Sequence, residues 1–174
     1  MGGWRRVSGG SRILVPVGES STFRNTVAYA VREARSAAAE RDGDETPAVH
    51  FIYLARWRAV DGGFQDDSER AADLLERVTV WAEEDLDYDD AAGVDIEIET
   101  AVVGADRYLF SPGDFAAIVA EYARDTGLGR VVVDPEFQPG GSAPMLRRFE
   151  VELSRSDLAV EEAPVERQTT RNGL

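Results

Sequence analysis

Short apolar runs alternate along the chain with segments whose apolar residues recur at helical spacing, and this alternation constrains the fold most strongly. The runs at residues 13–17, 49–55 and 131–133 are almost continuously apolar. Such runs are typical of interior strands in a parallel sheet whose two faces are both covered. The stretch at 94–102 instead alternates apolar residues with carboxylates, which predicts an edge strand with one face in water.

Four further segments predict amphipathic helices, because their apolar residues recur three or four positions apart. These residues are Val27, Val31, Ala34 and Ala38; Ala71, Leu74, Leu75, Val78 and Trp81; Phe115, Ile118, Val119 and Tyr122; and Leu146, Phe149 and Leu153. A short apolar stretch around Leu158 and Val160 predicts a last strand. The resulting order, β-α-β-α-β-α-β-α-β, predicts an α/β fold with an open parallel sheet and helices on both faces.

The alternation predicts one domain and two polar tails. We expect the domain at residues 12–166, a flexible N-terminal tail at 1–11 and a C-terminal tail at 167–174. The stretch from Arg56 to Asp67 is rich in aspartate and glycine, with Asp61-Gly62-Gly63 near its centre. We interpret it as a long loop at the rim of the sheet.

Charge and composition exclude several classes of function. The 33 acidic residues outnumber 19 basic ones, all of them arginine, for a net charge of −14. This balance argues against nucleic-acid binding, which needs a basic face. An acidic surface without lysine is typical of halophilic proteins, although drift toward arginine in a GC-rich genome gives the same pattern. The absence of cysteine and the single His50 argue against thiolate or histidine metal sites and against a catalytic triad.

No apolar run reaches the roughly 20 residues that a membrane span needs. Arg5-Arg6 near the start could suggest an export signal, but the apolar run at 13–17 is too short for an export core. We therefore expect a cytoplasmic protein with no membrane insertion.

The segment Arg12-Ile13-Leu14-Val15-Pro16-Val17-Gly18-Glu19-Ser20, followed by Asn25-Thr26-Val27-Ala28-Tyr29-Ala30, resembles the opening of the universal stress protein family. Members typically begin with an apolar strand that ends in Pro-Val-Asp-Gly-Ser and continue into an Ala-rich helix. The resemblance covers roughly residues 12–165. It implies a Rossmann-like sheet of five parallel strands in the order 3-2-1-4-5, whose order switches between the first and fourth strands.

Open α/β sheets bind ligands beyond the carboxyl ends of their strands at such a switch. Family members that bind ATP carry Gly-x2-Gly-x9-Gly-Ser/Thr after the fourth strand, where backbone N–H groups approach the phosphates. Here Asp134 and Phe137 stand at the first two glycine positions, and Arg147-Arg148 stand at the Gly-Ser position. Gly18 replaces the family's first-strand aspartate. The standard ATP-binding motif is therefore absent.

An altered nucleotide site remains the alternative, with ATP and Mg²⁺ as its ligands. Three carboxylates at the switch point, those of Glu19, Asp134 and Glu136, would repel a triphosphate unless Mg²⁺ bridged them. A flexible Gly-Gly-Ser loop and paired arginines could instead hold phosphate. The candidate nucleotide-binding residues are Val17, Gly18, Glu19, Ser20, Asp134, Gly140, Gly141, Ser142, Arg147 and Arg148.

The resemblance also implies a stress-response or regulatory role. Family dimers pair their last strands, so Leu158, Val160 and Val165 are candidate dimer-interface residues. We expect a homodimer that acts through contacts with another protein, for which the family suggests an ion-transport system. We expect no catalytic residues, no metal site and no cofactor, and the protein is not expected to be an enzyme.

Overall fold

The computed structural model describes residues 10–40, 46–55, 57–60, 63–66, 68–88, 95–104, 112–138 and 143–164. Seven strands and four helices lie within them: β1 (Arg12–Pro16), α1 (Phe23–Glu40), β2 (Ala48–Leu54), β3 (Trp57–Val60), β4 (Gly63–Asp66), α2 (Ser68–Tyr88), β5 (Glu97–Val103), α3 (Pro112–Thr126), β6 (Arg130–Val133), α4 (Ala143–Ser154) and β7 (Ala159–Glu162). All four predicted helices and all five predicted strands are present, with a strand pair added between β2 and α2.

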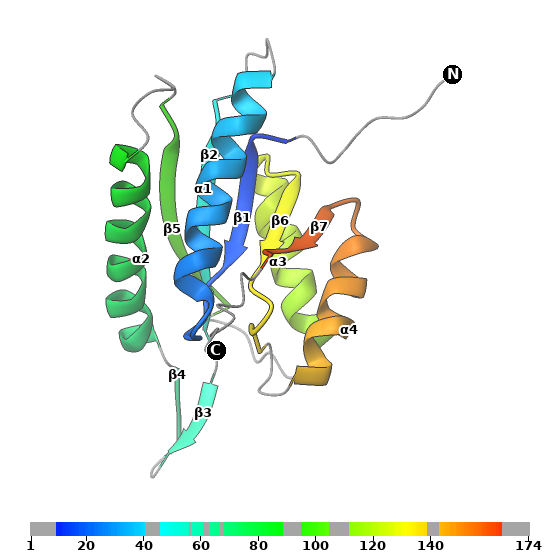
Figure 1. The fold of residues 1–174 in the computed structure, drawn as a ribbon. Coiled ribbons are helices and arrows are strands. Elements are labelled where there is room, and N and C mark those ends of the chain that lie inside the picture. The colour runs from blue at the N-terminus through cyan, green and yellow to red at the C-terminus, as the bar shows by residue number, and fades with distance from the viewer. Residues whose placement is uncertain are drawn as a thin grey trace, which may run out of the picture.

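Five strands form one parallel sheet in the order β5-β2-β1-β6-β7 (Figure 1). Counted along the chain without the extra pair, this is the predicted order 3-2-1-4-5. Strand β1 is buried except for its first residue, and β6 is buried throughout. The prediction of a parallel α/β sheet is therefore confirmed. Its continuous apolar runs suit strands whose two faces are both covered by helices.

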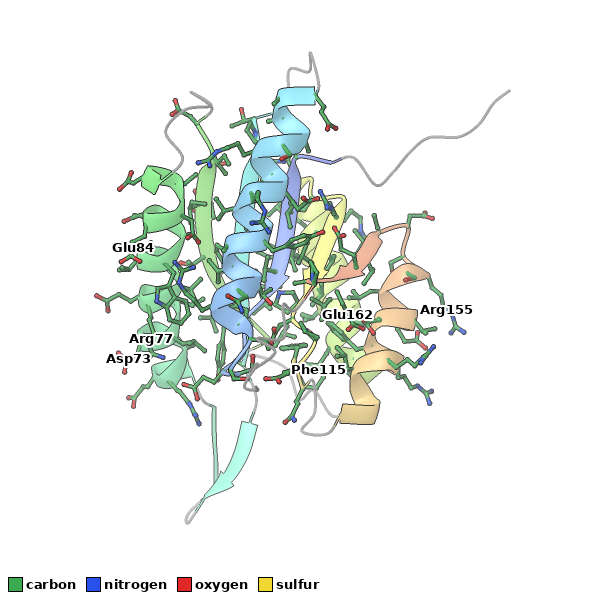
Figure 2. All side chains as sticks on the ribbon, viewed as in Figure 1. Asp73, Arg77, Glu84, Phe115, Arg155 and Glu162 are labelled. Atoms are coloured by element: carbon green, nitrogen blue, oxygen red, sulfur yellow. The ribbon has the colours of Figure 1, made fainter. Side chains whose placement is uncertain are left out.

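Helices α1 and α2 cover one face of the sheet, and α3 and α4 cover the other (Figure 1). Successive side chains of β1 point to opposite faces. Ile13 and Val15 therefore join the core under α1 and α2, while Leu14 joins the core under α3 and α4. Phe115, labelled in Figure 2, is fully buried in the second core, as its helical spacing predicts.

The edge strand β5 follows the prediction in part. Glu97 and Glu99 are exposed, as their alternation with apolar residues indicates. However, Ala101 and Val103 pack partly against the core on the α3 side, and Val102 on the other face is 39% exposed. Exposed side chains therefore lie on both faces of β5 rather than on one.

The prediction of a long loop from Arg56 to Asp67 is wrong. Strands β3 and β4 pair in antiparallel register over this stretch, with Val60 opposite Gly63 and Trp57 opposite Asp66. They form a separate two-stranded sheet, which projects beyond the carboxyl end of the parallel sheet (Figure 1). The sequence held the signal, because Asp61-Gly62 is one of the dipeptides that two-residue hairpin turns favour.

None of the helices within the described ranges combines the length and apolar character that crossing a membrane requires.

Candidate functional site

The strand order reverses between β1 and β6, which are direct neighbours in the sheet. From β1 the chain crosses over to β2 on one side, and from β6 it crosses to β7 on the other. The loops after β1 and β6 therefore diverge at the carboxyl end of the sheet, where ligands of such folds bind. The order switch lies where the resemblance places it.

Asp134, the residue directly after β6, is turned into the protein rather than toward solvent. Only 1% of its surface is exposed. Its Oδ1 accepts hydrogen bonds from Thr22 Oγ1 at 2.6 Å and Thr26 Oγ1 at 2.8 Å, and its Oδ2 accepts one from Ser20 Oγ at 2.5 Å. The three donors lie between β1 and the second turn of α1. Asp134 therefore binds the two diverging loops together across the switch point.

Phe137 occupies the space beside Asp134. Its backbone N–H donates to the Asp134 carbonyl at 2.9 Å, which closes a turn after β6. Its ring is buried and lies 5.6 Å, centroid to centroid, from the ring of Phe149 on α4. The ring also lies beside Gly18, where an added Cβ would stand 3.1 Å from the ring's Cδ1.

The two departures from the family motif at Gly18 and Phe137 are therefore coupled. A Cβ at 3.1 Å is tighter than ordinary van der Waals contact, so the aspartate that the family carries at position 18 would force the Phe137 ring to shift by a few tenths of an ångström. Glycine at 18 fits beside the ring without such a shift.

The remaining candidate residues of the first loop are also engaged. Val17 is buried, and its N–H donates to the Ile52 carbonyl at 2.8 Å. Glu19 forms an exposed ion pair with Arg70 of α2 at 2.5 Å. Glu136 accepts a hydrogen bond from Ser21 Oγ at 2.9 Å. Of the carboxylates expected to repel a triphosphate, Asp134 is thus buried and Glu19 is paired with a cation.

The candidate residues of the second loop do not gather at the switch point. Gly140, Gly141 and Ser142 lie outside the described residues. Arg147 and Arg148 are exposed on α4, and Arg147 lines a groove between α4 and β7 rather than the space between β1 and β6. The structure therefore does not bring the paired arginines together with Gly18 and Ser20.

The dimer-interface candidates lie at the outer edge of the sheet. Leu158 and Val160 are half-buried and pack against the core under α3 and α4. Val165 lies outside the described residues. Strand β7 pairs with β6 on one side only, so its other edge has no partner strand within the described part of the chain.

His50 is a core residue of β2, as its position between apolar neighbours predicts. Its Nδ1 lies 2.9 Å from the Tyr122 hydroxyl, and its Nε2 has no hydrogen-bond partner among the described residues. Burial lowers the pKa of His50, and the charge of Arg12 lowers it further. Both effects favour the neutral form of the ring. Among the described residues, no three His, Cys, Asp or Glu side chains are grouped so that they could hold a metal ion.

Two polar clusters were missed by sequence reasoning. The first is the set of hydroxyls around Asp134, for which Thr22 and Thr26 gave a signal, since they lie one helical turn apart at the start of α1. The second is the pair Glu150 and Glu162 between α4 and β7. It gave no signal in the sequence, because only the packing of α4 against β7 brings the two side chains together.

No protein-family model and no curated protein sequence matches the chain. Among solved structures, a protein of the universal stress protein family from Burkholderia pseudomallei is similar, with a TM-score of 0.53 and 18% identity over 91% of this chain and 98% of that one. A universal stress protein in complex with cAMP is also similar, with a TM-score of 0.47 and 16% identity over 88% of this chain and 95% of that one. The first likeness shows that the chain has the Rossmann-like fold of universal stress proteins.

Proposed function

We propose that this chain is a regulatory domain of the universal stress protein type that acts through protein contacts, as a dimer paired at β7, and that it has no ATP site at the switch point. The observation that carries this proposal is the occupation of the switch point by the chain's own Asp134 and Phe137. Both side chains are more than nine-tenths buried.

A phosphate site at this position would need free backbone N–H groups and room for close approach. The Phe137 N–H is already bonded to the Asp134 carbonyl. The Phe137 ring lies close to both Gly18 and Phe149, and the negative charge of the Asp134 carboxylate would repel a second anion. These contacts support a closed switch point with an internal, structural role.

ATP with Mg²⁺ is expected to produce no saturable heat in a calorimetric titration of the full chain in molar KCl. High salt is chosen so that the net charge of −14 is screened and repulsion over long distances does not by itself prevent binding. The Phe137→Ala variant, titrated in parallel, tests whether the ring is the obstacle. Saturable heat from the unmodified protein at micromolar to submillimolar ATP would contradict the proposal and favour the altered nucleotide site.

The proposed dimer rests on the geometry of β7. The N–H groups of Ala159 and Ala163 donate to the Gly129 and Val133 carbonyls next to β6. Because successive residues of a strand point to alternate sides, the N–H and C=O groups of Val160 and Glu162 point away from β6, toward the free edge. An unpaired edge of this kind is a template for another strand. In a symmetric dimer, the same edge of a second copy fills it.

Replacing Val160 by proline is expected to abolish dimer formation while leaving the fold intact. Proline removes the outward N–H that a second strand would bond, and edge strands tolerate proline where that N–H faces solvent. Sedimentation equilibrium of the full chain measures the effect. We expect a monomer–dimer equilibrium for the unmodified protein and a monomer for Val160→Pro.

Val102→Pro is the matched control on the opposite edge. Glu97 and Val103 bond toward β2 through their N–H and C=O groups respectively, so the N–H of Val102 points outward from β5. This variant is expected to dimerise like the unmodified protein. Loss of the dimer in Val102→Pro but not in Val160→Pro would place the interface at β5, contrary to the proposal.

A further inference from the structure

The outer edge of β5 carries unpaired backbone groups that the proposed function does not use. The N–H of Glu97 donates to the Pro47 carbonyl, and the carbonyl of Val103 accepts from the Ala55 N–H. Alternate residues from 97 to 103 therefore bond toward β2, and the N–H and C=O groups of the residues between them point outward. These outward residues are Ile98, Thr100 and Val102. Within the described part of the chain, no strand pairs with this edge.

The exposed side chains of β5 differ in chemistry between its two faces. Glu97 and Glu99 are exposed on the face that carries Ala101 and Val103 toward the core under α3. Thr100 and Val102 are exposed on the opposite face, that of α2. A strand added at this edge would therefore meet carboxylates on one face and a hydroxyl and an apolar side chain on the other.

The two carboxylates of β5 have little compensating positive charge. The nearest approach of a cation to Glu97 is that of Arg12, at 4.0 Å, and the Arg12 guanidinium donates its hydrogen bonds to three backbone carbonyls instead. Glu99 forms no ion pair with any residue that the structure describes. His50 stands opposite Glu99 in the register of β2 and β5, but burial lowers the pKa of His50 and so favours its uncharged form.

An extended basic segment fits both properties of this edge. In strand addition, main-chain hydrogen bonds give affinity and the alternate side chains of the added strand give specificity. Arginine or lysine at every second position would lie beside Glu97 and Glu99, where opposite charges in neighbouring strands attract. The β-branched residues between them would lie beside Thr100 and Val102 on the other face. Seven residues of β5 are available for such pairing.

We propose that the free edge of β5 is the surface that binds the partner protein, and that it takes an extended segment in which arginine or lysine alternates with β-branched apolar residues. The inference rests on the proposed action through protein contacts and adds the chemistry of the partner. It does not depend on the dimer at β7, because β5 and β7 are the opposite edges of the sheet.

Titration of the full chain with a labelled octapeptide of alternating valine and arginine, blocked at both ends, tests this inference. Fluorescence anisotropy at about 0.15 M salt measures binding. The control peptide has the same sequence with every backbone nitrogen methylated, so it keeps the charge but cannot donate main-chain hydrogen bonds. We expect saturable binding of the first peptide and a dissociation constant at least about tenfold higher for the second.

A backbone substitution in β5 locates the bound peptide. Val102→Pro removes an outward N–H, so we expect it to raise the dissociation constant of the valine–arginine peptide by about tenfold. Val102→Thr keeps the N–H and the β-branched shape, and we expect a change of about twofold at most. In the unmodified protein, the peptide is expected to slow hydrogen exchange at the amides of Thr100 and Val102.

A pair of double variants separates local charge from net charge. Glu97→Gln with Glu99→Gln removes both carboxylates of β5, and we expect the dissociation constant of the peptide to rise by about tenfold. Asp73→Asn with Glu76→Gln makes the same change in net charge on exposed positions of α2, where Figure 2 shows Asp73 on the outer side of the helix. For this control we expect a change of about twofold at most.

The opposite results have distinct meanings. Equal dissociation constants for the two peptides, or equal effects of the two double variants, would show nonspecific attraction to an acidic chain and overturn the β5 site. Absence of binding by the valine–arginine peptide would overturn it as well. Neither result changes the sedimentation of the β7 dimer or the titration with ATP, which test the proposed function separately.

Discussion

Replacing Asp134 by alanine is expected to cost about 3–5 kcal/mol of unfolding free energy, measured by urea denaturation. The change removes the acceptor of three hydroxyl donors, and two of them, Thr22 and Thr26, are buried. A hydrogen bond to a charged group contributes about 1.5–3 kcal/mol, and bonds to one shared acceptor are not additive. The loss is therefore smaller than three separate bonds would suggest.

Glu136→Ala is the control for this prediction. Glu136 lies two residues further along the same loop and also accepts a hydroxyl hydrogen bond, from Ser21, but this contact is exposed. We expect its loss to change stability by about 0.5 kcal/mol at most. The Asp134→Asn variant keeps the shape of the side chain but places an amide N–H₂ against a hydroxyl. We expect its loss of unfolding free energy to lie between those of Asp134→Ala and Glu136→Ala. An alanine variant within about 1 kcal/mol of the unmodified protein would show that Asp134 does not hold the loops together.

Replacing Arg130 by methionine is expected to cost about 2–4 kcal/mol. The Arg130 side chain is 7% exposed and forms ion pairs with Glu33 of α1 and Glu161 of β7, the former at 2.6 Å. Burial lowers the pKa of Arg130, but the hydrogen bonds to the two carboxylates outweigh it and raise the pKa. Methionine would leave both carboxylates without their cation. The expected cost is below that of a fully buried pair because both carboxylates are about one-third exposed.

Two further variants isolate the cause. Arg155→Met removes the arginine of an exposed pair with Glu152, and we expect a change of about 0.5 kcal/mol at most. Adding Glu33→Gln to Arg130→Met should recover part of the loss, because one uncompensated charge is removed. If Arg130→Met and Arg155→Met lose equal stability by urea denaturation, burial of the ion pair is not what makes Arg130 important.

The order and layering of the main sheet could be predicted from the sequence because each element carries its own periodic signal. The continuous apolar run at 131–133 predicts a central strand, and β6 is one. The hairpin β3–β4 was missed although Asp61-Gly62 is a favoured turn dipeptide. Its flanking residues do not alternate strictly between apolar and polar, so the composition suggested a loop.

The chemistry of the switch point could be predicted only in part. The sequence shows that Asp134 and Phe137 stand where glycines are expected, but not which way their side chains point. The carboxylate of Asp134 was expected to line the crevice as a free negative charge. It is buried because Ser20, Thr22 and Thr26, more than 100 residues away in the chain, supply hydroxyl donors that single-sequence reasoning does not locate.

The contact between Gly18 and the Phe137 ring also constrains the order in which substitutions can accumulate. A Cβ at position 18 would stand 3.1 Å from the ring, so the ring would have to shift by a few tenths of an ångström to admit a side chain there. Once Phe137 has been replaced by a small residue, no such shift is needed. Replacing Phe137 before Gly18 is therefore the order of substitution with the lower steric cost.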